Sequence, residues 1–268
     1  MLDEKRKFYV TASQCHRVMA GFERELAGQG ATMPEFESCQ SILTWITDCE
    51  KKPLVGELKV DGIFATGGEI KEAWDYARSQ VTVFSEGMES VAREIAMAEF
   101  VDVRDPGAKT FDMERGHIQQ GEALDYLSWV LDIEFSATDE PEEFITRGNL
   151  GVTPDGIYRK DGKILDCAEV KNPIDTTHMR YLSLIHSQEC LLKYAPIYYW
   201  QAQCGMHVTG ANKYHWLSYH KGFMRHNCCG VYVCVRPNIE HISMLVNRAK
   251  RVLARSVVIT NEILERIS

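Results

Sequence analysis

A motif near the middle of the chain, Asp155 followed by Glu169-Val170-Lys171, holds residue types that can do chemistry on a phosphodiester. Between them, Asp161-Gly162 predicts a tight hairpin turn, with Glu169 and Lys171 at the end of its second strand. Side chains alternate along a strand, so Glu169 and Lys171 share one face while Val170 points to the other. We expect Asp155, at the start of the opposing strand, to converge on that same face.

These residue types suit metal-assisted hydrolysis. Two carboxylates bind a hard divalent cation such as Mg²⁺ through oxygen ligands, and an ammonium beside them can orient a water molecule. The plainer interpretation makes Asp155 a turn former and places Glu169 and Lys171 on a solvated strand face. Against it, Ile164 and Ala168 mark a largely buried strand, on which an acid and a lysine without partners would be costly.

The composition is that of an ordinary globular protein: the chain has 268 residues, 45% hydrophobic and 25% charged. No apolar run reaches the roughly 18 residues that a membrane span needs, and the N-terminus lacks the apolar core of a signal peptide. The nine cysteines include no C-x-x-C pair, which is typical of reduced thiols. We therefore predict a cytoplasmic protein that does not associate with membranes.

The charge is unevenly distributed, although the whole chain carries −8. Residues 172–255 hold ten Lys and Arg against three acids, a balance of +7, which leaves −15 for the rest of the chain. A basic face on an acidic body fits a protein that guides DNA along one surface. Scattered, solvated charges are the alternative interpretation.

The predicted elements run as helices, then a central sheet, then helices, which indicates one domain of mixed α/β class over residues 1–268. No internal repeat or linker interrupts this order. Helices are predicted at 11–19, 38–50, 85–100, 113–131, 176–186, 190–208 and 238–267, and strands at 144–147, 156–159, 164–170, 213–219 and 230–236, with a short hairpin between 54 and 68.

Five short motifs occur in a recognisable order along residues 6–210. In these motifs the chain resembles the λ-exonuclease family, also called the YqaJ-type viral recombinases, within the PD-(D/E)xK nuclease superfamily. Any one of them is weakly specific, but together they agree in order and approximate spacing. The matching stretches are Val10–Ser13, Arg115-Gly116, Thr153–Gly156, Glu169–Pro173 and Tyr199–Gln203.

The resemblance implies a restriction-endonuclease-like core, a central mixed β-sheet flanked by helices. It implies Asp155, Glu169 and the backbone carbonyl of Val170 as ligands of Mg²⁺, with Mn²⁺ as a substitute. Lys171 would position the attacking water. Of the two glutamines on the helix that follows, Gln201 is the one expected near the active site.

Arg6, Ser13 and Thr153 match positions that the family uses to hold the 5′-phosphate of a DNA end. The chemistry is reasonable, because a guanidinium fork and hydroxyl groups beside a helix N-terminus form an anion site. The expected site therefore combines a metal centre with a pocket for a terminal phosphate.

The sequence departs from the family in two places. Gln120 stands where a glutamate is usual, so it is a candidate further contact to the metal that supplies no charge, and the site could hold one or two ions. The stretch between Ser13 and Gly116 is also unusually long, which indicates an insertion around residues 45–106.

By resemblance, the chain would be a Mg²⁺-dependent 5′-to-3′ exonuclease on linear double-stranded DNA, of bacteriophage type. It would release 5′-mononucleotides and leave 3′ single-stranded overhangs for recombination. Its partners would be DNA ends, a single-strand annealing protein and two further copies in a homotrimer, in the cytoplasm of a host if viral. Two alternatives stay open: an endonuclease on the same scaffold, and a catalytically weakened DNA-end-binding recombination adaptor, which Gln120 suggests.

Overall fold

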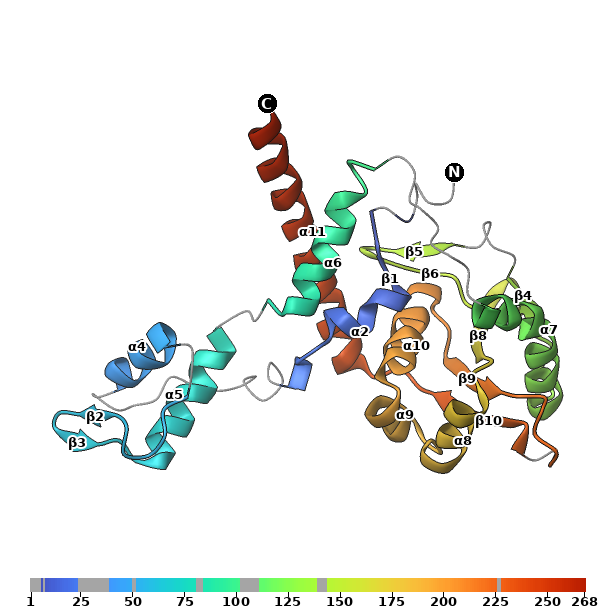
Figure 1. Ribbon diagram of the computed structural model, residues 1–268, viewed down its shortest axis with the longest axis horizontal. Coiled ribbons are helices and arrows are strands. Elements are labelled where there is room, and N and C mark those ends of the chain that lie inside the picture. The colour runs from blue at the N-terminus through green and yellow to red at the C-terminus, as the bar shows by residue number, and fades with distance from the viewer. Residues whose placement is uncertain are drawn as a thin grey trace. The chain divides into compact units, whose positions relative to one another are not determined.

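The structure is a computed structural model that describes residues 6, 8–23, 39–49, 52–80, 84–101, 111–138, 144–225 and 228–268. The chain divides into two compact units, Met1–Met19 with Glu86–Ser268, and Ala20–Ser85. The larger unit contains the motif residues and is described first (Figure 1).

The hairpin predicted at Asp161-Gly162 forms the middle of a five-stranded sheet with the order β10-β9-β8-β7-β4. Asp161 and Gly162 have positive φ angles of 52° and 74°, the backbone that a two-residue hairpin turn of type I′ requires. β9 runs parallel to β8, whereas the other neighbouring pairs are antiparallel. The strands are β4 (Ser136–Ala137), β7 (Gly156–Lys160), β8 (Lys163–Lys171), β9 (Lys213–Tyr219) and β10 (Gly230–Val235).

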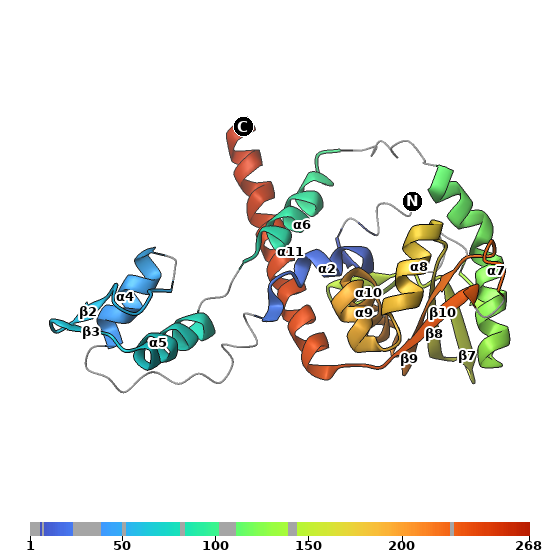
Figure 2. The same ribbon diagram turned by 60° about the horizontal axis from the view of Figure 1, so that its bottom comes forward.

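Helices cover both faces of this sheet, which explains why β8 and β9 are apolar along most of their length. On one face, α7 (Phe111–Leu131) packs Leu124 and Leu127 against Ala168 and Val170. The other face carries Glu169 and Lys171. It is covered by α8 (Asp175–Leu184), α9 (Gln188–Tyr194) and α10 (Pro196–Thr209), which lie together on one side of the strands in Figure 2. The motif therefore ends a strand inside a three-layered structure.

The sequence predicted one helix over 190–208, but the structure has two helices there, α9 and α10. α8 (Asp175–Leu184) is followed by α9 (Gln188–Tyr194) and by α10 (Pro196–Thr209). Pro196 stands at the start of α10, where its missing N–H costs nothing, but it could not continue α9. Ser187 begins α9, and its hydroxyl accepts a hydrogen bond from the backbone N–H of Cys190 at 3.2 Å.

Ser187→Ala is expected to lower the free energy of unfolding by about 1 kcal/mol, because the cap of α9 loses its acceptor. Urea denaturation followed by circular dichroism measures the change. Ser187→Thr keeps a hydroxyl and serves as the control. Equal stability of the alanine and threonine variants would contradict the assigned cap.

A second, small sheet joins the N-terminus to the middle of the chain. β1 (Val10–Thr11) pairs in parallel with β6 (Leu150–Val152), which pairs antiparallel with β5 (Ile145–Arg147). The helix predicted from Thr11 is instead this strand, a 3₁₀ turn η1 (Ala12–Gln14) and the short α2 (Cys15–Val18). Thr11 has an extended backbone and its N–H donates to Gln14 Oε1 at 3.0 Å, so Thr11 caps the first turn and the helical residues begin after it.

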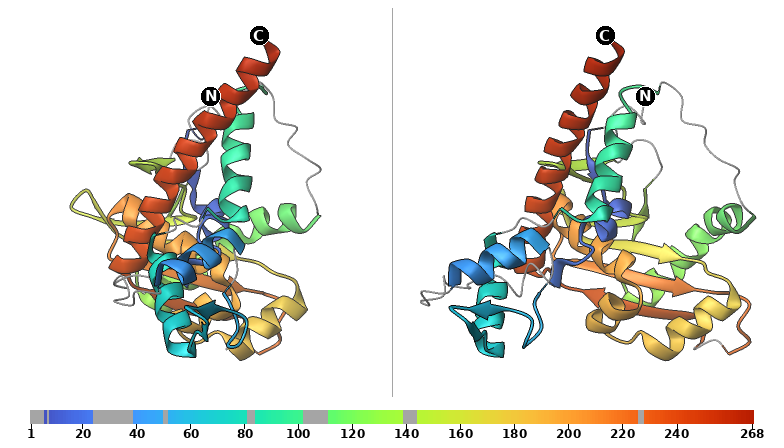
Figure 3. Two further views of the ribbon diagram at one scale, coloured as in Figure 1. Left: turned by 90° about the vertical axis from the view of Figure 1, so that its left-hand side faces the viewer. Right: turned by 60° about the vertical axis from the view of Figure 1, so that its left-hand side comes forward.

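Two long helices, α6 (Glu86–Met97) and α11 (Ile239–Ile267), lie side by side against the N-terminal segment, as both views of Figure 3 show. Arg255 donates to both carboxylate oxygens of Glu89 at 3.1 Å. The buried Arg248 donates to the carbonyl of Val18 at 2.9 Å. The first contact joins α11 to α6, and the second fixes the segment that carries β1 to α11.

The unit Ala20–Ser85 has its own apolar core, with Ile42, Ile46 and Ile70 among its buried side chains. It contains α4 (Cys39–Cys49), the predicted hairpin β2 (Lys59–Val60) and β3 (Ile63–Phe64), and α5 (Gly67–Gln80). This unit overlaps the insertion expected around 45–106. That one domain carries an insertion here stays a prediction.

None of the helices among the described residues is both long and apolar enough to cross a membrane. None of the seven cysteines whose side chains the structure describes forms a disulfide.

Candidate active site

The two carboxylates of the motif face each other across the end of the β7–β8 hairpin. Asp155 is held by its backbone N–H, which donates to the carbonyl of Ala168 at 3.0 Å, and its Oδ2 accepts from the N–H of Val170 at 2.8 Å. The ammonium of Lys171 lies 2.5 Å from Glu169 Oε1 and 3.7 Å from Asp155 Oδ2. The convergence expected from strand alternation is therefore present.

Lys171 is a cation held between two anions in a partly buried place. Burial acts to lower the pKa of its ammonium, but the carboxylates of Glu169 and Asp155 outweigh burial and raise that pKa above its ordinary value. Lys171 is therefore charged at neutral pH in this arrangement, and it can donate hydrogen bonds but cannot accept a proton.

Of the three glutamines near the motifs, two lie at the carboxylates and one does not. Gln120 donates to Asp155 Oδ1 at 3.3 Å, and Gln201 donates to Glu169 Oε1 at 3.2 Å, so both lie at the carboxylates. Gln203 is fully buried elsewhere, where it bonds the backbone of Arg236 and Asn238. The preference for Gln201 over Gln203 as the residue near the site agrees with this placement.

Gln120 stands where a glutamate was expected, and the nearby Glu122 does not take the place of that acid. Its carboxylate accepts a hydrogen bond from Tyr219 at 3.0 Å and pairs with Lys221 at 3.3 Å. Gln120 itself is a side chain of α7 that bonds Asp155.

The residues expected to bind a phosphate line the same cavity as the carboxylates. This cavity has a volume of about 230 Å³. Strand β1 beside β6 brings the N-terminal residues to Thr153, which lies more than a hundred positions along the chain. Six predicted site residues line the cavity: Arg6, Ser13, Thr153, Asp155, Glu169 and Gln201.

The phosphate-binding candidates are held in place by direct contacts. Arg6 Nη2 donates to Thr153 Oγ1 at 3.0 Å, and its guanidinium lies 5.3 Å from the ring centre of Phe144. The hydroxyls of Thr11 and Ser13 are 3.1 Å apart. A guanidinium and several hydroxyls thus surround one space, and this is the chemistry of an anion site.

The donor set at the carboxylates fits a hard divalent cation. In a strand, the N–H and the C=O of one residue point to the same side. The N–H of Val170 donates to Asp155, so the carbonyl of Val170 also lies on the side of Asp155. Within the described part of the chain, no group of three or more His, Cys, Asp or Glu side chains is placed to hold a metal ion. A cation here would rely on two carboxylates together with carbonyl or amide oxygens.

Two tyrosines that contact the site were not predicted from the sequence. Tyr214 donates from its hydroxyl to Glu169 Oε2 at 3.2 Å, and the Tyr198 ring centre lies 5.8 Å from Lys171 Nζ. Burial first, then the charge of Glu169, raises the pKa of Tyr214 well above its ordinary value. Little in the sequence indicates that Tyr214 lies at Glu169, because this position depends on the parallel register of β8 and β9, which sets Cys167 opposite Tyr214.

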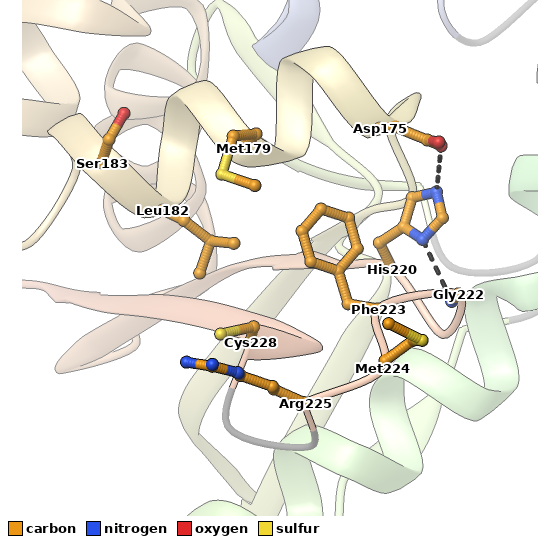
Figure 4. Close-up of a pocket in the computed structure, with 10 residues that line it drawn as sticks. All are labelled: Asp175, Met179, Leu182, Ser183, His220, Gly222, Phe223, Met224, Arg225 and Cys228. Carbon is orange, nitrogen blue, oxygen red and sulfur yellow. Dashed lines mark hydrogen bonds and ion pairs between the residues drawn. The ribbon is translucent and has the colours of Figure 1, made fainter.

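Other groups of polar residues lie away from this cavity. A larger cavity of about 720 Å³ is lined by Met179, Phe223 and Met224, with His220 bonded to Asp175 at 2.9 Å (Figure 4). It contains none of the predicted site residues. The buried pair of His215 and Asp166, 3.0 Å apart, lies on the α7 face of the sheet.

Part of the positive charge of segment 172–255 is paired with acidic residues from other parts of the chain. Lys221 pairs with Glu122, Lys213 lies 3.9 Å from Asp166, and Arg255 binds Glu89. The excess of +7 therefore overstates the charge that this segment presents to a partner.

The chain is similar to known proteins in structure alone. No protein-family model matches the chain, and no curated protein matches it in sequence. A crystal structure of LHK-Exo, an alkaline exonuclease from Laribacter hongkongensis, matches with a TM-score of 0.55 at 16% identity, covering 69% of this chain and 88% of that one.

Two further solved structures agree. LHK-Exo in complex with dAMP matches with a TM-score of 0.60 at 14% identity, over 99% of this chain and 96% of that one. A phage-related exonuclease from Haemophilus somnus 129PT matches with a TM-score of 0.53 at 10% identity, over 69% and 85%. The mixed α/β fold class predicted from the sequence is confirmed, and the chain shares the fold of these exonucleases.

Proposed function

We propose that this chain is a Mg²⁺-dependent exonuclease that degrades linear double-stranded DNA from the 5′ end. The observation that carries the proposal is the single cavity in which Arg6, Ser13 and Thr153 lie beside Asp155 and Glu169. A binding place for a terminal phosphate next to a pair of carboxylates and a lysine is what cleavage near a DNA end requires. The shared fold with alkaline exonucleases supports the same activity.

Each residue has a defined task in this proposal. Arg6, Ser13 and Thr153 bind the 5′-phosphate and so set the distance from the end to the bond that is cut. Asp155, Glu169 and the Val170 carbonyl hold Mg²⁺, which Mn²⁺ can replace. When bound, the ion supplies positive charge where negative charge develops on the phosphate. Lys171 donates a hydrogen bond that orients the attacking water, and Gln201 holds Glu169 Oε1.

The side chain of Gln120 affects how many ions the site can hold. Gln120 reaches Asp155 with its amide N–H₂ group, at 3.3 Å from Oδ1. Its amide oxygen could contact an ion but supplies no charge, so we propose one firmly held ion, with a second as the less favoured arrangement.

The products and partners follow the resemblance in the motifs. The products are 5′-mononucleotides and a 3′ single-stranded overhang, and LHK-Exo has been solved with dAMP, a nucleotide of that kind. We further propose a homotrimer around DNA, cooperation with a single-strand annealing protein, and a cytoplasmic location, in the host if the chain is viral.

The central experiment digests linear duplex labelled at either its 5′ or its 3′ end, with and without a 5′-phosphate, in the presence of Mg²⁺. We expect preferential loss of the 5′ label from phosphorylated ends. Earlier loss of the 3′ label would reject both the polarity and the role of the phosphate pocket. Cutting of circular duplex would favour the endonuclease alternative, and DNA-end binding without nucleotide release would favour the adaptor.

Combined replacement of Arg6 and Ser13 by alanine is expected to reduce the preference for phosphorylated over unphosphorylated ends by about tenfold or more, since charge-assisted bonds of about 1.5–3 kcal/mol are lost. Initial rates on the two substrates give the ratio. Arg147→Ala is the control, because Arg147 is exposed and bonds the backbone of His207 outside the cavity. An unchanged preference in the double variant would show that the pocket does not recognise the end.

A further inference from the structure

The two carboxylate oxygens of Glu169 have different surroundings. Oε1 accepts from Lys171 and from Gln201, which lines the cavity with Glu169. Oε2 accepts from the hydroxyl of Tyr214 at 3.2 Å, and Tyr214 is fully buried. One oxygen is therefore turned toward the cavity and its polar groups, and the other toward the interior.

Tyr214 has little freedom to leave this position. It lies within β9, in register with Cys167 of β8 and on the face of the sheet that also carries Glu169. The backbone of α10 packs directly on its ring: a Cβ atom added at Gly205 would lie 2.2 Å from Tyr214 Cε2. Because the ring is clamped between strand and helix, its hydroxyl stays directed at Glu169.

The way in which a carboxylate binds an ion depends on which of its oxygens are available. Mg²⁺ demands near-octahedral geometry and takes single oxygens, whereas Ca²⁺ accepts six to eight oxygens and bidentate carboxylates. Oε1 also accepts hydrogen bonds, but its donors are the long side chains of Lys171 and Gln201, which can turn toward other groups. Oε2 is bonded to a buried hydroxyl whose ring is held between strand and helix, so it is the poorer second ligand. The hydroxyl of Tyr214 thus acts against bidentate binding by Glu169.

We propose that Tyr214 is a positioning residue that commits Glu169 to binding an ion through Oε1 alone and so favours Mg²⁺ over Ca²⁺. This inference rests on the proposed function, since it concerns the same metal centre. It adds a determinant of ion choice on a buried strand, outside the motif that supplies the ligands.

The test compares wild-type protein with Tyr214→Phe, which removes only the hydroxyl. Calorimetric titration with MgCl₂ and with CaCl₂, without DNA, gives both dissociation constants. We expect the affinity for Mg²⁺ to fall about tenfold, as is usual when a group that orients a ligand is lost. The affinity for Ca²⁺ should fall much less or rise, so that the ratio of the two constants shifts toward Ca²⁺.

A matched control lies on the same strand. Tyr219 also donates from its hydroxyl to a glutamate, Glu122, at 3.0 Å, but on the opposite face of the sheet. Tyr219→Phe should leave the ratio of Mg²⁺ to Ca²⁺ affinity unchanged. Circular dichroism establishes that both variants are folded.

The outcomes separate the inference from the proposed function. If Tyr214→Phe weakens both ions equally, or changes neither, the role in ion choice is wrong although the nuclease proposal stands. If wild-type protein binds neither ion and releases no nucleotide, the proposed function itself fails. A double variant with Glu169→Gln adds a second check: without the carboxylate, removal of the Tyr214 hydroxyl should no longer shift the ratio.

Discussion

Lys171→Ala is expected to slow nucleotide release by about 10²-fold or more, because the attacking water loses the ammonium that orients it between the two carboxylates. Binding of DNA ends should persist, since Arg6, Ser13 and Thr153 are untouched. Single-turnover digestion of end-labelled duplex, beside a binding measurement in Ca²⁺, separates the two effects. A variant that keeps the full rate would show that Lys171 has no part in the reaction.

The same variant should also change stability. Without its ammonium, Asp155 and Glu169 repel each other in a partly buried place, so the melting temperature in EDTA should fall. Added Mg²⁺ would restore positive charge at that point and should stabilise the variant more than it stabilises the wild type. Lys163→Ala, at the exposed start of the same strand, is the control and should change neither rate nor ion response.

Asp155→Asn should slow Mg²⁺-dependent digestion by about 100-fold or more. The variant loses a ligand of the ion, and the ion stabilises the transition state by several kcal/mol. The amide can still accept the hydrogen bond from the N–H of Val170, so the hairpin end should keep its shape. The distinguishing result is the ion response: the rise in melting temperature on addition of Mg²⁺ should disappear.

The control for this variant is Asp161→Asn in the turn of the same hairpin. Asp161 has a φ of 52°, a conformation that asparagine adopts readily, so the charge is removed without backbone strain. It should keep both the nuclease rate and the response to Mg²⁺. If Asp155→Asn also kept them, the metal site would have to lie elsewhere.

Local patterns predicted the hairpin and the residues that meet at its end. An Asp-Gly turn and strict alternation are properties of neighbouring residues, so the positions of Glu169 and Lys171 on one face followed directly from the sequence. A predicted helix over 190–208 failed for an equally local reason, because the effect of Pro196 at a helix start was not weighed. The helix Gly67–Gln80 was not predicted, because its first two residues are glycines, which are poor helix formers. Thr66 and Glu69 nevertheless form a capping box at its start, in which each side chain accepts from the backbone N–H of the other.

Other parts of the site could not be read from the sequence in physical terms. The pairing of Val10 with Leu150 is a long-range contact that no local preference encodes. The resemblance in motifs predicted Arg6 and Ser13 at the site, but the contacts of Arg6 with Thr153 and Phe144 depend on that pairing. Tyr214 reaches Glu169 only because β9 runs parallel to β8 in one particular register.

The strand β1 also has a consequence for how the protein is made. Its partner β6 begins at Leu150, so during synthesis β1 has nothing to pair with until about 140 further residues have been added. At ordinary rates of translation this takes roughly 10–30 seconds. The place proposed for the terminal phosphate is therefore assembled late, only after β6 has been added to the growing chain.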